Sequence, residues 1–369
     1  IRMIRPLVLI RFGPLRSNLF GLFAFETEVY LCESDAGIHG RRTFDIFYHL
    51  PPVCNRQLKK MWERKLHFFP FANRLFWANH QVPGGRAHVI PRCTEQERDV
   101  HGLLAHTQTH LSFTRKEERL GQAALRQMGI PEGAPFVCFH ARDPAYFVAF
   151  SPNSKSHYAA DYRDASIQNY VAAAEELARR GYFAIRMGAV VAEPLPSNNP
   201  MVIDYAVKHR TDFLDIYLGA NCRFFLSSNN GAYGVAATFR RPIVWTNMGA
   251  LEYVHTWNAE ELFIPKKLCL REEGRVMTFR EIFDSGVGRL SLTQEFEEHG
   301  IELIENTPEE IAAVVVEMDE RLKGTWQTTE EDEELQRRFW SMFPPSEWHG
   351  KILCRIGAGF LRENRDLLD

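Results

Sequence analysis

The residue types best able to do chemistry follow a short apolar run in the middle of the chain. Residues 136–139 (Phe-Val-Cys-Phe) have the length and composition of a buried strand, and His140, Arg142 and Asp143 come directly after it. His140 and Arg142 fall on one face of an extended chain, which favours a shared ligand. The alternatives are a histidine hydrogen-bonded within the sheet edge and a charged surface turn.

Other apolar runs of the second half also end in polar groups or glycines. Arg186 and Gly188 close one run, and Asp204 closes the next. Because the carboxyl ends of parallel strands meet at one edge of a sheet, we expect these residues to line one ligand-binding crevice. Asp204 and Asp215 could contact a ribose or a base, or could instead cap helices and form ion pairs.

The turn Ser227, Ser228, Asn229, Asn230, Gly231 has the composition of a phosphate-binding loop. Its hydroxyl, amide and glycine residues precede a predicted helix, whose free N–H groups favour an anion. A guanidinium group, such as that of Arg142 or Arg186, can bind a diphosphate through two parallel hydrogen bonds. A plain turn is the alternative. The chain has neither GxxxxGK[ST] nor GxGxxG, so neither a P-loop nor a dinucleotide fold of the usual kind is expected.

Strands that alternate with helices predict an α/β fold with doubly wound sheets. A chain of 369 residues exceeds one typical core, and we place a domain boundary at the linker 130–135. The first domain would span 1–130 and the second 131–345, with a C-terminal helix in 346–369 packing back on the first. In the first domain we expect strands at 6–12, 29–32, 44–50 and 87–90, a helical region at 55–79 and a capped helix at 114–128.

The charge, hydrophobicity and cysteine pattern of the chain argue against several classes of protein. The net charge is −3, so nucleic acid is not expected as the main partner. The chain contains no uninterrupted run of 18 apolar residues, so no membrane-spanning helix is predicted. Peripheral contact with a membrane stays open. The seven cysteines are scattered without a CxxC pair, which favours a reducing compartment, the cytoplasm, and argues against a zinc site.

Seven segments, in this order, resemble a family of bacterial glycosyltransferases. They are CFHARD (138–143), YRD (162–164), IRMG (185–188), VIDY (202–205), DFLDI (212–216), RRPI (240–243) and IPKK (264–267). The similarity runs from about residue 8 to 360. The family is more distantly similar to fucosyltransferases that hold a GDP-sugar with a His-x-Arg strand end and a Ser-Ser turn. The resemblance implies a GT-B fold, in which two Rossmann-like domains face a central cleft, without a required metal.

On this resemblance we expect a metal-independent, inverting-type glycosyltransferase that acts on a hydroxyl of a cell-surface glycan or a specialised metabolite. Its co-substrate would be a nucleotide-diphosphate sugar, with a GDP-sugar favoured, and it would need no other cofactor. The second domain would hold this donor and the first domain the acceptor. Arg142, the amides of 228–231 and Arg186 would stabilise the leaving diphosphate.

The expected base is a carboxylate that takes the acceptor's proton, with Glu28 as the first candidate and Asp143 as the second. The family's first loop reads Arg-Ile-Gly-His, whereas this chain has Leu22 at the position of the histidine. A nucleotide-sugar-binding protein without transfer activity, or a nucleotide-sugar epimerase or hydrolase on the same architecture, is therefore the rival interpretation.

Overall fold

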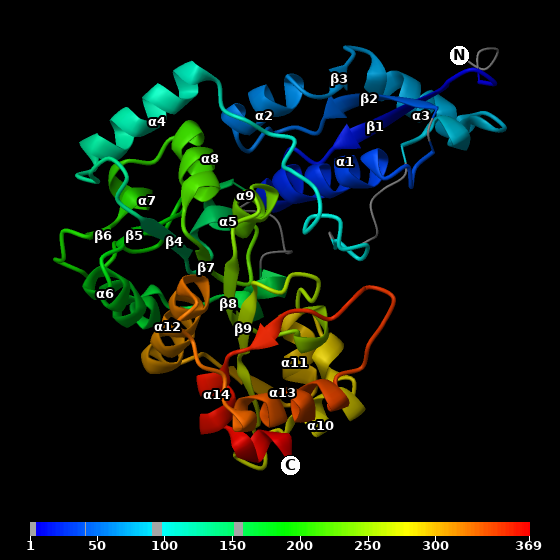
Figure 1. Cartoon of the computed structure of the whole chain (residues 1–369). Helices are drawn as coiled ribbons and strands as arrows, with labels where there is room; N and C mark the ends of the chain where they lie inside the picture. The colour runs from blue at the N-terminus through cyan, green and yellow to red at the C-terminus, as the bar shows by residue number, and fades with distance from the viewer. Residues whose placement is uncertain (1–4, 41, 91–97, 151–157) are drawn as a thin grey trace.

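The structure is a computed structural model that describes residues 5–40, 42–90, 98–150 and 158–369. It contains two α/β units, the smaller one built from the N-terminal part of the chain (blue in Figure 1). In the smaller unit three parallel strands pair in the order β1-β2-β3, and Val89 bridges Phe12 of β1. The elements of this unit are β1 (Leu9–Leu15), η2 (Leu22–Glu26), α1 (Thr27–Asp35), β2 (Thr43–His49), α2 (Arg56–Glu63), β3 (His67–Phe68), α3 (Ala72–Gln81) and η3 (Gly85–His88).

The larger unit is a seven-stranded sheet in the order β13-β9-β8-β7-β4-β5-β6, with every pair parallel. The chain runs outward from β4 to β6, returns to β7, and continues to the other edge. This is the strand order of a doubly wound Rossmann-like sheet, so the expected fold class is confirmed. The strands are β4 (Phe136–His140), β5 (Phe183–Arg186), β6 (Val202–Ile203), β7 (Phe225–Ser228), β8 (Ile243–Met248), β9 (Leu262–Pro265) and β13 (Arg355–Ile356).

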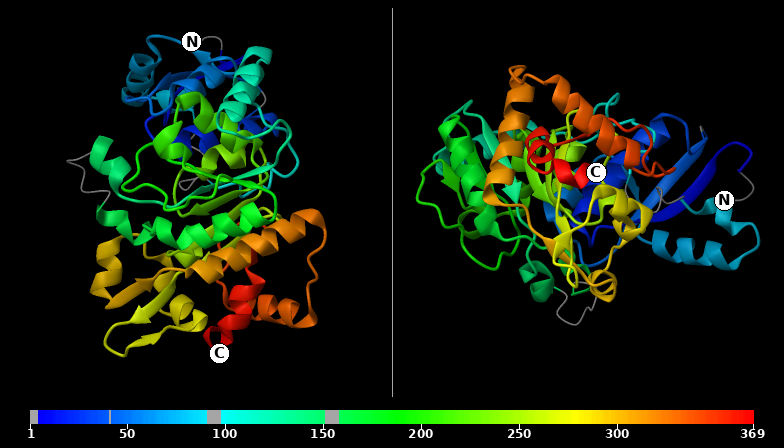
Figure 2. Two further views of the ribbon diagram at one scale, coloured as in Figure 1. Left: turned by 90° about the vertical axis from the view of Figure 1, so that its left-hand side faces the viewer. Right: turned by 90° about the horizontal axis from the view of Figure 1, so that it is seen from below.

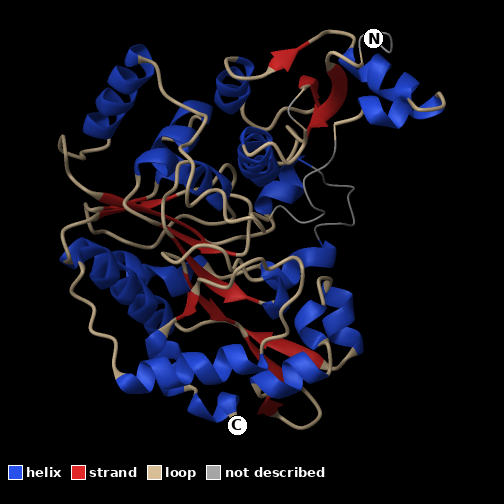
Figure 3. Cartoon of the chain, turned by 45° about the vertical axis from the view of Figure 1, so that its right-hand side comes forward, coloured by secondary structure: helices blue, strands red, loops and turns tan. Residues whose placement is uncertain are grey.

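Helices cover both faces of this sheet. Figure 1 shows α6 and α12 on one side and α8 and α9 on the other, and Figure 3 shows the strands between them. The longer helices are α4 (Arg115–Gln127), α6 (Val171–Arg179), α8 (Asp212–Asn221), α12 (Pro308–Lys323) and α13 (Glu330–Met342). The shorter ones are α5 (Ala145–Phe150), α7 (Tyr205–Lys208), α9 (Tyr233–Thr238), α10 (Phe279–Asp284), α11 (Thr293–Glu298) and α14 (Ala358–Glu363). A small antiparallel sheet joins β10 (Lys267–Leu270), β11 (Arg275–Val276) and β12 (Ile301–Ile304).

Several expected elements of the first unit are corrected. Residues 29–32 are not a strand but part of α1, where Val29 and Cys32 are buried together with Phe25 of the preceding turn η2. The helical region 55–79 is two helices separated by β3, with Pro70 between them. Residues 87–90 supply only a bridge, and β1 continues through residues 13 and 14 to Leu15.

The helix starts read from capping residues are confirmed. Thr114 and Glu117 form the reciprocal capping box at the start of α4. Thr307 and Glu310 do the same for α12, with Pro308 at its first position. Such boxes depend on four neighbouring residues, so the sequence alone is enough to find them.

The C-terminal helix α14 does not pack on the first unit, contrary to expectation. The Ala358 N–H donates to Glu317 of α12 over 2.7 Å, and Arg362 pairs with Asp332 of α13 over 2.7 Å. Figure 2 shows the C-terminus at the opposite end of the molecule from the N-terminus. The boundary near residue 130 stays a prediction, since α4 before it packs on α8, where Gln122 donates to the Tyr217 hydroxyl over 3.1 Å.

The two units meet through three glycines. A Cβ on Gly21, just before η2, would lie 2.8 Å from the Cα of Gly231, and one on Gly234 would lie 2.9 Å from the Cα of Gly21. η2 and α9 therefore run side by side at backbone contact. Farther along, Phe25 and Val29 enter the main core of the larger unit, so the units share apolar contacts beyond the glycines.

We predict that Gly21→Ala lowers the free energy of unfolding by roughly 1–3 kcal/mol, because its methyl group would overlap backbone atoms that cannot move aside. Gly359→Ala is the control, since a Cβ there meets nothing closer than 3.7 Å. Chemical denaturation of both variants measures the difference. Equal stability of the two variants would show that the glycine contact is loose.

Candidate functional site

The chain reverses direction across the larger sheet between β4 and β7, and the predicted site residues converge there. His140 of β4 is paired with Ser227 of β7. Beyond the strand ends, the backbone N–H of Arg142 donates to the Ser228 hydroxyl over 2.8 Å. Crevices for ligands in open α/β sheets form at this point of reversal. The structure thus places His140, Arg142 and the Ser227–Ser228 pair together, as expected.

Three cations gather at this edge. The Arg142 guanidinium is 5% exposed and forms an ion pair with Asp164. Burial and the neighbouring Arg163 lower the pKa of Arg142 to about 10. Lys266, directly after β9, is also buried and donates from Nζ to the Asp164 carbonyl over 2.7 Å. Its pKa is lowered by burial, and Arg142 adds to this effect. Cations held this close favour an anionic ligand.

Two buried nitrogen atoms at this edge have no hydrogen-bond partner among the described residues. They are His140 Nδ1 and Arg163 Nε. Burial lowers the pKa of His140 to about 4, with Arg186 and Arg142 adding to the shift and Asp143 opposing it. The imidazole is therefore neutral at pH 7. Buried polar atoms normally have partners, so both atoms point to a ligand at this place.

Arg186, Gly188 and Asp204 lie beside this group but face the protein interior. Arg186 is 1% exposed, donates to the Glu193 carbonyl over 2.6 Å and lies 3.5 Å from Asp204. Asp204 in turn accepts from the Leu195 N–H over 2.8 Å. Gly188 has φ +154°, and a Cβ there would meet Val191 at 2.6 Å. These contacts indicate a bracing role for the loop after β5, and a direct contact of Arg186 with a diphosphate stays a prediction.

Two further carboxylates are engaged with the protein itself. Asp143 accepts from the Ala145 N–H over 2.8 Å and from the Ala192 N–H over 3.2 Å. Asp215 accepts from the Tyr205 hydroxyl and from Arg210, and burial raises its pKa to about 6. Of the alternatives for Asp215, these contacts favour the ion pair over a ribose contact.

The turn 227–231 is held by its own side chains. Asn230 donates to the Ser228 carbonyl over 2.7 Å and accepts from the Ala232 N–H over 2.7 Å. Gly231 lies against Gly21, so its missing side chain makes room for the first unit. Phosphate binding by Asn229 and its neighbours stays a prediction, and the structure shows this turn supporting Arg142 through Ser228.

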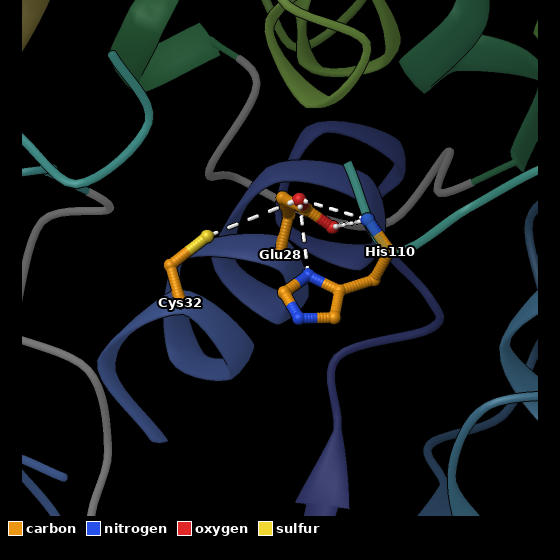
Figure 4. Close-up of side chains that lie close together, drawn as sticks. All are labelled: Glu28, Cys32 and His110. Atoms are coloured by element: carbon orange, nitrogen blue, oxygen red, sulfur yellow. Dashed lines mark hydrogen bonds and ion pairs between the residues drawn. The ribbon is translucent and has the colours of Figure 1, made fainter. Parts of the chain in front are cut away.

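Glu28 lies away from the ends of β4 and β7. Its carboxylate is fully buried and accepts from the backbone N–H and ring Nδ1 of His110, each over 3.2 Å (Figure 4). It also accepts from Arg240 over 2.7 Å. Glu28 is seven residues beyond Gly21, which is about 10 Å along a helix. Its partner Arg240 follows the far end of α9. Glu28 therefore joins the two units away from the strand ends and is poorly placed to be the base.

Glu28, Cys32 and His110 have ligand atoms close enough together to hold a metal ion. The Arg240 guanidinium already lies 2.7 Å from Glu28 and 3.5 Å from the Cys32 sulfur. Contacts with Cys32 and Glu28 raise the pKa of His110 to about 10. Protonated His110 and Arg240 supply the positive charge of this cluster, and we assign no metal to it.

We predict that Glu28→Ala lowers the free energy of unfolding by about 2–4 kcal/mol, because Arg240, whose side chain is 20% exposed, and His110 then lose their fully buried carboxylate partner. Asp35→Ala is the matched control. Asp35 pairs with the same His110 over 3.0 Å but is 70% exposed, so its loss costs at most about 1 kcal/mol. Thermal or urea unfolding measures both variants. If Glu28→Ala costs no more than Asp35→Ala, Glu28 does not join the units.

Three residues near the site were not predicted from the sequence. Lys266 could have been found, because it directly follows an apolar run, 262–265, at the same sheet edge. Arg163 lies within the resembling segment YRD, but nothing in that segment links it to Arg142, and only the folded loop brings the two together. Glu26 lies in the π-helical turn η2 beside the glycine contact, 3.8 Å from Arg16. π-Helical turns are frequent at functional sites.

A cavity of about 600 Å³ lies elsewhere, on the first unit between α1, β2 and β3. Asp35, Asp45 and Lys65 are among its lining residues. None of the predicted site residues lines this cavity, so we do not assign the chemistry to it.

No family model and no curated protein matches the chain. Similar solved structures include a glycosyl transferase family 9 protein from Veillonella parvula DSM 2008, with 10% identity, a TM-score of 0.45 and coverage of 86% of this chain and 97% of that one. ADP-heptose lps heptosyltransferase II of E. coli has 11% identity, a TM-score of 0.38 and coverage of 64% and 84%. E. coli heptosyltransferase WaaC with ADP-2-deoxy-2-fluoro heptose has 10% identity, a TM-score of 0.35 and coverage of 68% and 91%. At these scores the likeness assigns no activity, and these structures lend no support to a fucosyltransferase likeness.

Proposed function

We propose that this chain is a glycosyltransferase that moves a sugar from a nucleotide-diphosphate sugar to a hydroxyl group of an acceptor. One observation carries the proposal: Arg142, Arg163 and Lys266 gather at the carboxyl ends of β4 and β9, beside two buried nitrogen atoms that have no hydrogen-bond partner in the part of the chain that the structure describes. A diphosphate is the common ligand that would satisfy such a group of donors and charges. The segment resemblance noted above points in the same direction.

The cations would act on the leaving group. As the sugar–oxygen bond breaks, negative charge grows on the diphosphate, and fixed positive charges nearby stabilise that state more than the ground state. Asp164 now balances Arg142, so the diphosphate would take over part of the role of this carboxylate. The Ser228 hydroxyl fixes the backbone of Arg142, which keeps its guanidinium from reorienting during the reaction.

For the base we favour Glu26 over Glu28. Leu22, at the position of the family's histidine, is buried and offers no proton acceptor. Glu26 follows it by about one helical turn, and its side chain is 16% exposed beside Arg16. It would take the proton of the acceptor hydroxyl as the oxygen attacks the sugar. The missing histidine also leaves a second candidate, a protein that binds a nucleotide sugar without transferring it.

The donor and the acceptor are open to experiment. A GDP-sugar stays the first donor to test because of the segment resemblance, with ADP- and UDP-sugars beside it. Release of nucleoside diphosphate is measured with and without acceptor extracts. Release only with acceptor supports transfer, release without acceptor indicates a hydrolase, and binding without release indicates the second candidate.

We predict that Arg142→Ala lowers turnover at least about a hundredfold, because the leaving diphosphate loses a charged partner where charge develops. Arg126→Ala is the control, since the Arg126 side chain is 55% exposed on α4. Unfolding temperatures show whether both variants fold. Near-normal turnover of folded Arg142→Ala would reject the assignment of this residue.

We also predict transfer without a divalent metal, because the three cations supply the charge that a diphosphate-bound ion would otherwise provide. Turnover is compared before and after EDTA, and again after addition of manganese or magnesium. Activity that disappears with EDTA and returns with either ion would contradict metal independence.

A further inference from the structure

One end of the first unit carries exposed apolar side chains, which we call the tip patch: Phe69, Phe71, Trp77 and Val82. They are 47%, 54%, 62% and 43% exposed. They belong to α3 and the segments on either side of it, at the end of the smaller unit farthest from the larger one (Figure 1). Single exposed apolar residues are ordinary, but a group of them marks a contact surface.

The fold does not need these side chains. α3 holds to its sheet by the opposite face, where Ala72 and Phe76 are buried with Phe12 of β1. Trp77 touches Phe76 only by its edge, with ring centroids 5.4 Å apart. The exposed face of α3 is therefore available to a partner, and substitutions on it should leave the core unchanged.

The sequence around the tip patch contains basic residues and no acidic ones. Residues 64–90 contain four arginines and lysines, three histidines and no acidic residue, although the whole chain has a net charge of −3. Arg64 pairs with Glu117 over 2.9 Å. Lys65 lines the cavity that also contains Asp35 and Asp45. Arg74 and Arg86 are exposed, and in the described part of the chain no carboxylate pairs with them. The Arg74 guanidinium lies 5.4 Å from the centre of the Phe71 ring.

We propose that the tip patch docks on the surface of a bilayer that contains anionic lipids. Tryptophan and phenylalanine rings settle at the depth of the headgroups, where an apolar body and a polar edge are both satisfied. Arg74 and Arg86 would pair with anionic headgroups around them. This charge complementarity selects an anionic membrane over a neutral one. Among the described residues, no helix is long and apolar enough to cross a bilayer.

A nucleic acid fits the same surface less well. Stable binding to a polyphosphate backbone uses many cations, and only Arg74 and Arg86 are available beside the tip patch among the described residues. The docking does not depend on the proposed function, because α3 lies in the smaller unit, away from β4 and β7 (Figure 1). A membrane-held chain would then meet acceptors at the lipid surface.

The test is co-sedimentation of the full chain with vesicles of phosphatidylcholine alone and of an equal mixture with phosphatidylglycerol. We expect binding to the anionic vesicles that weakens with salt. Arg74→Gln and Arg86→Gln should each weaken it about fivefold. Phe71→Ser with Trp77→Ser should weaken it at least about tenfold. The controls are Leu120→Ser and Arg126→Gln on α4, where the side chains are similarly exposed.

Unfolding temperatures are measured for every variant, and only variants that match the unsubstituted chain are compared. Equal binding of the tip and control variants would overturn the proposal, as would equal binding to neutral and anionic vesicles. No vesicle binding, together with a dimer that Trp77→Ser abolishes or with RNA binding that Arg74→Gln abolishes, would assign the surface to that other partner and would also overturn it.

Discussion

The contact between Gly21 and the pair Gly231 and Gly234 fixes how the two units of this protein meet. At this contact backbone lies on backbone, so no side chain can adjust the distance between η2 and α9. The apolar residues that follow, Phe25 and Val29, then enter the core of the larger unit. As a consequence, the π-helical turn η2, which contains Glu26, lies beside α9 and the turn that precedes it. Because the core is shared, any large separation of the two units would have to expose these apolar residues to water.

Electrostatics then distinguishes the site from the rest of the sheet. Burying one cation costs free energy unless a carboxylate or an anionic ligand balances it. At the ends of β4 and β9 the balance is local: the Asp164 carboxylate pairs with Arg142, and Lys266 donates to the Asp164 backbone carbonyl with Glu305 and Asp161 nearby. In the Glu28–Arg240 pair the carboxylate is buried and the guanidinium half-buried, and both are hydrogen-bonded within the protein. At the ends of β4 and β9, His140 Nδ1 and Arg163 Nε have no partner among the described residues, and this difference favours a binding role there over a structural one.

Much of this arrangement follows from the sequence, and the reasons are local. The runs that form β4, β5 and β6 are apolar and end in or are followed by polar residues, so both the strands and the binding edge could be predicted. Capping boxes at Thr114 and Thr307 could be predicted for the same reason. Residues 29–32 could not, because a short apolar run suits a strand or a buried helix equally well until the neighbouring element is known.

The roles of individual side chains were harder to predict because they depend on distant partners. Arg142 and Arg186 look alike in the sequence, yet only the fold shows that Arg186 turns toward Asp204 and the Glu193 carbonyl. Glu28 was a reasonable base until Arg240, more than two hundred residues away, was found to pair with it. Arg163 and Lys266 became candidates through the same kind of long-range contact.

A structure of the chain with a bound nucleoside diphosphate would test the central claim most directly. The account predicts the two phosphates within hydrogen-bond distance of Arg142 and at least one of Arg163 and Lys266, with His140 Nδ1 or Arg163 Nε newly partnered. A nucleotide held instead in the cavity between α1, β2 and β3, or one whose phosphates contact none of the three cations, would contradict it.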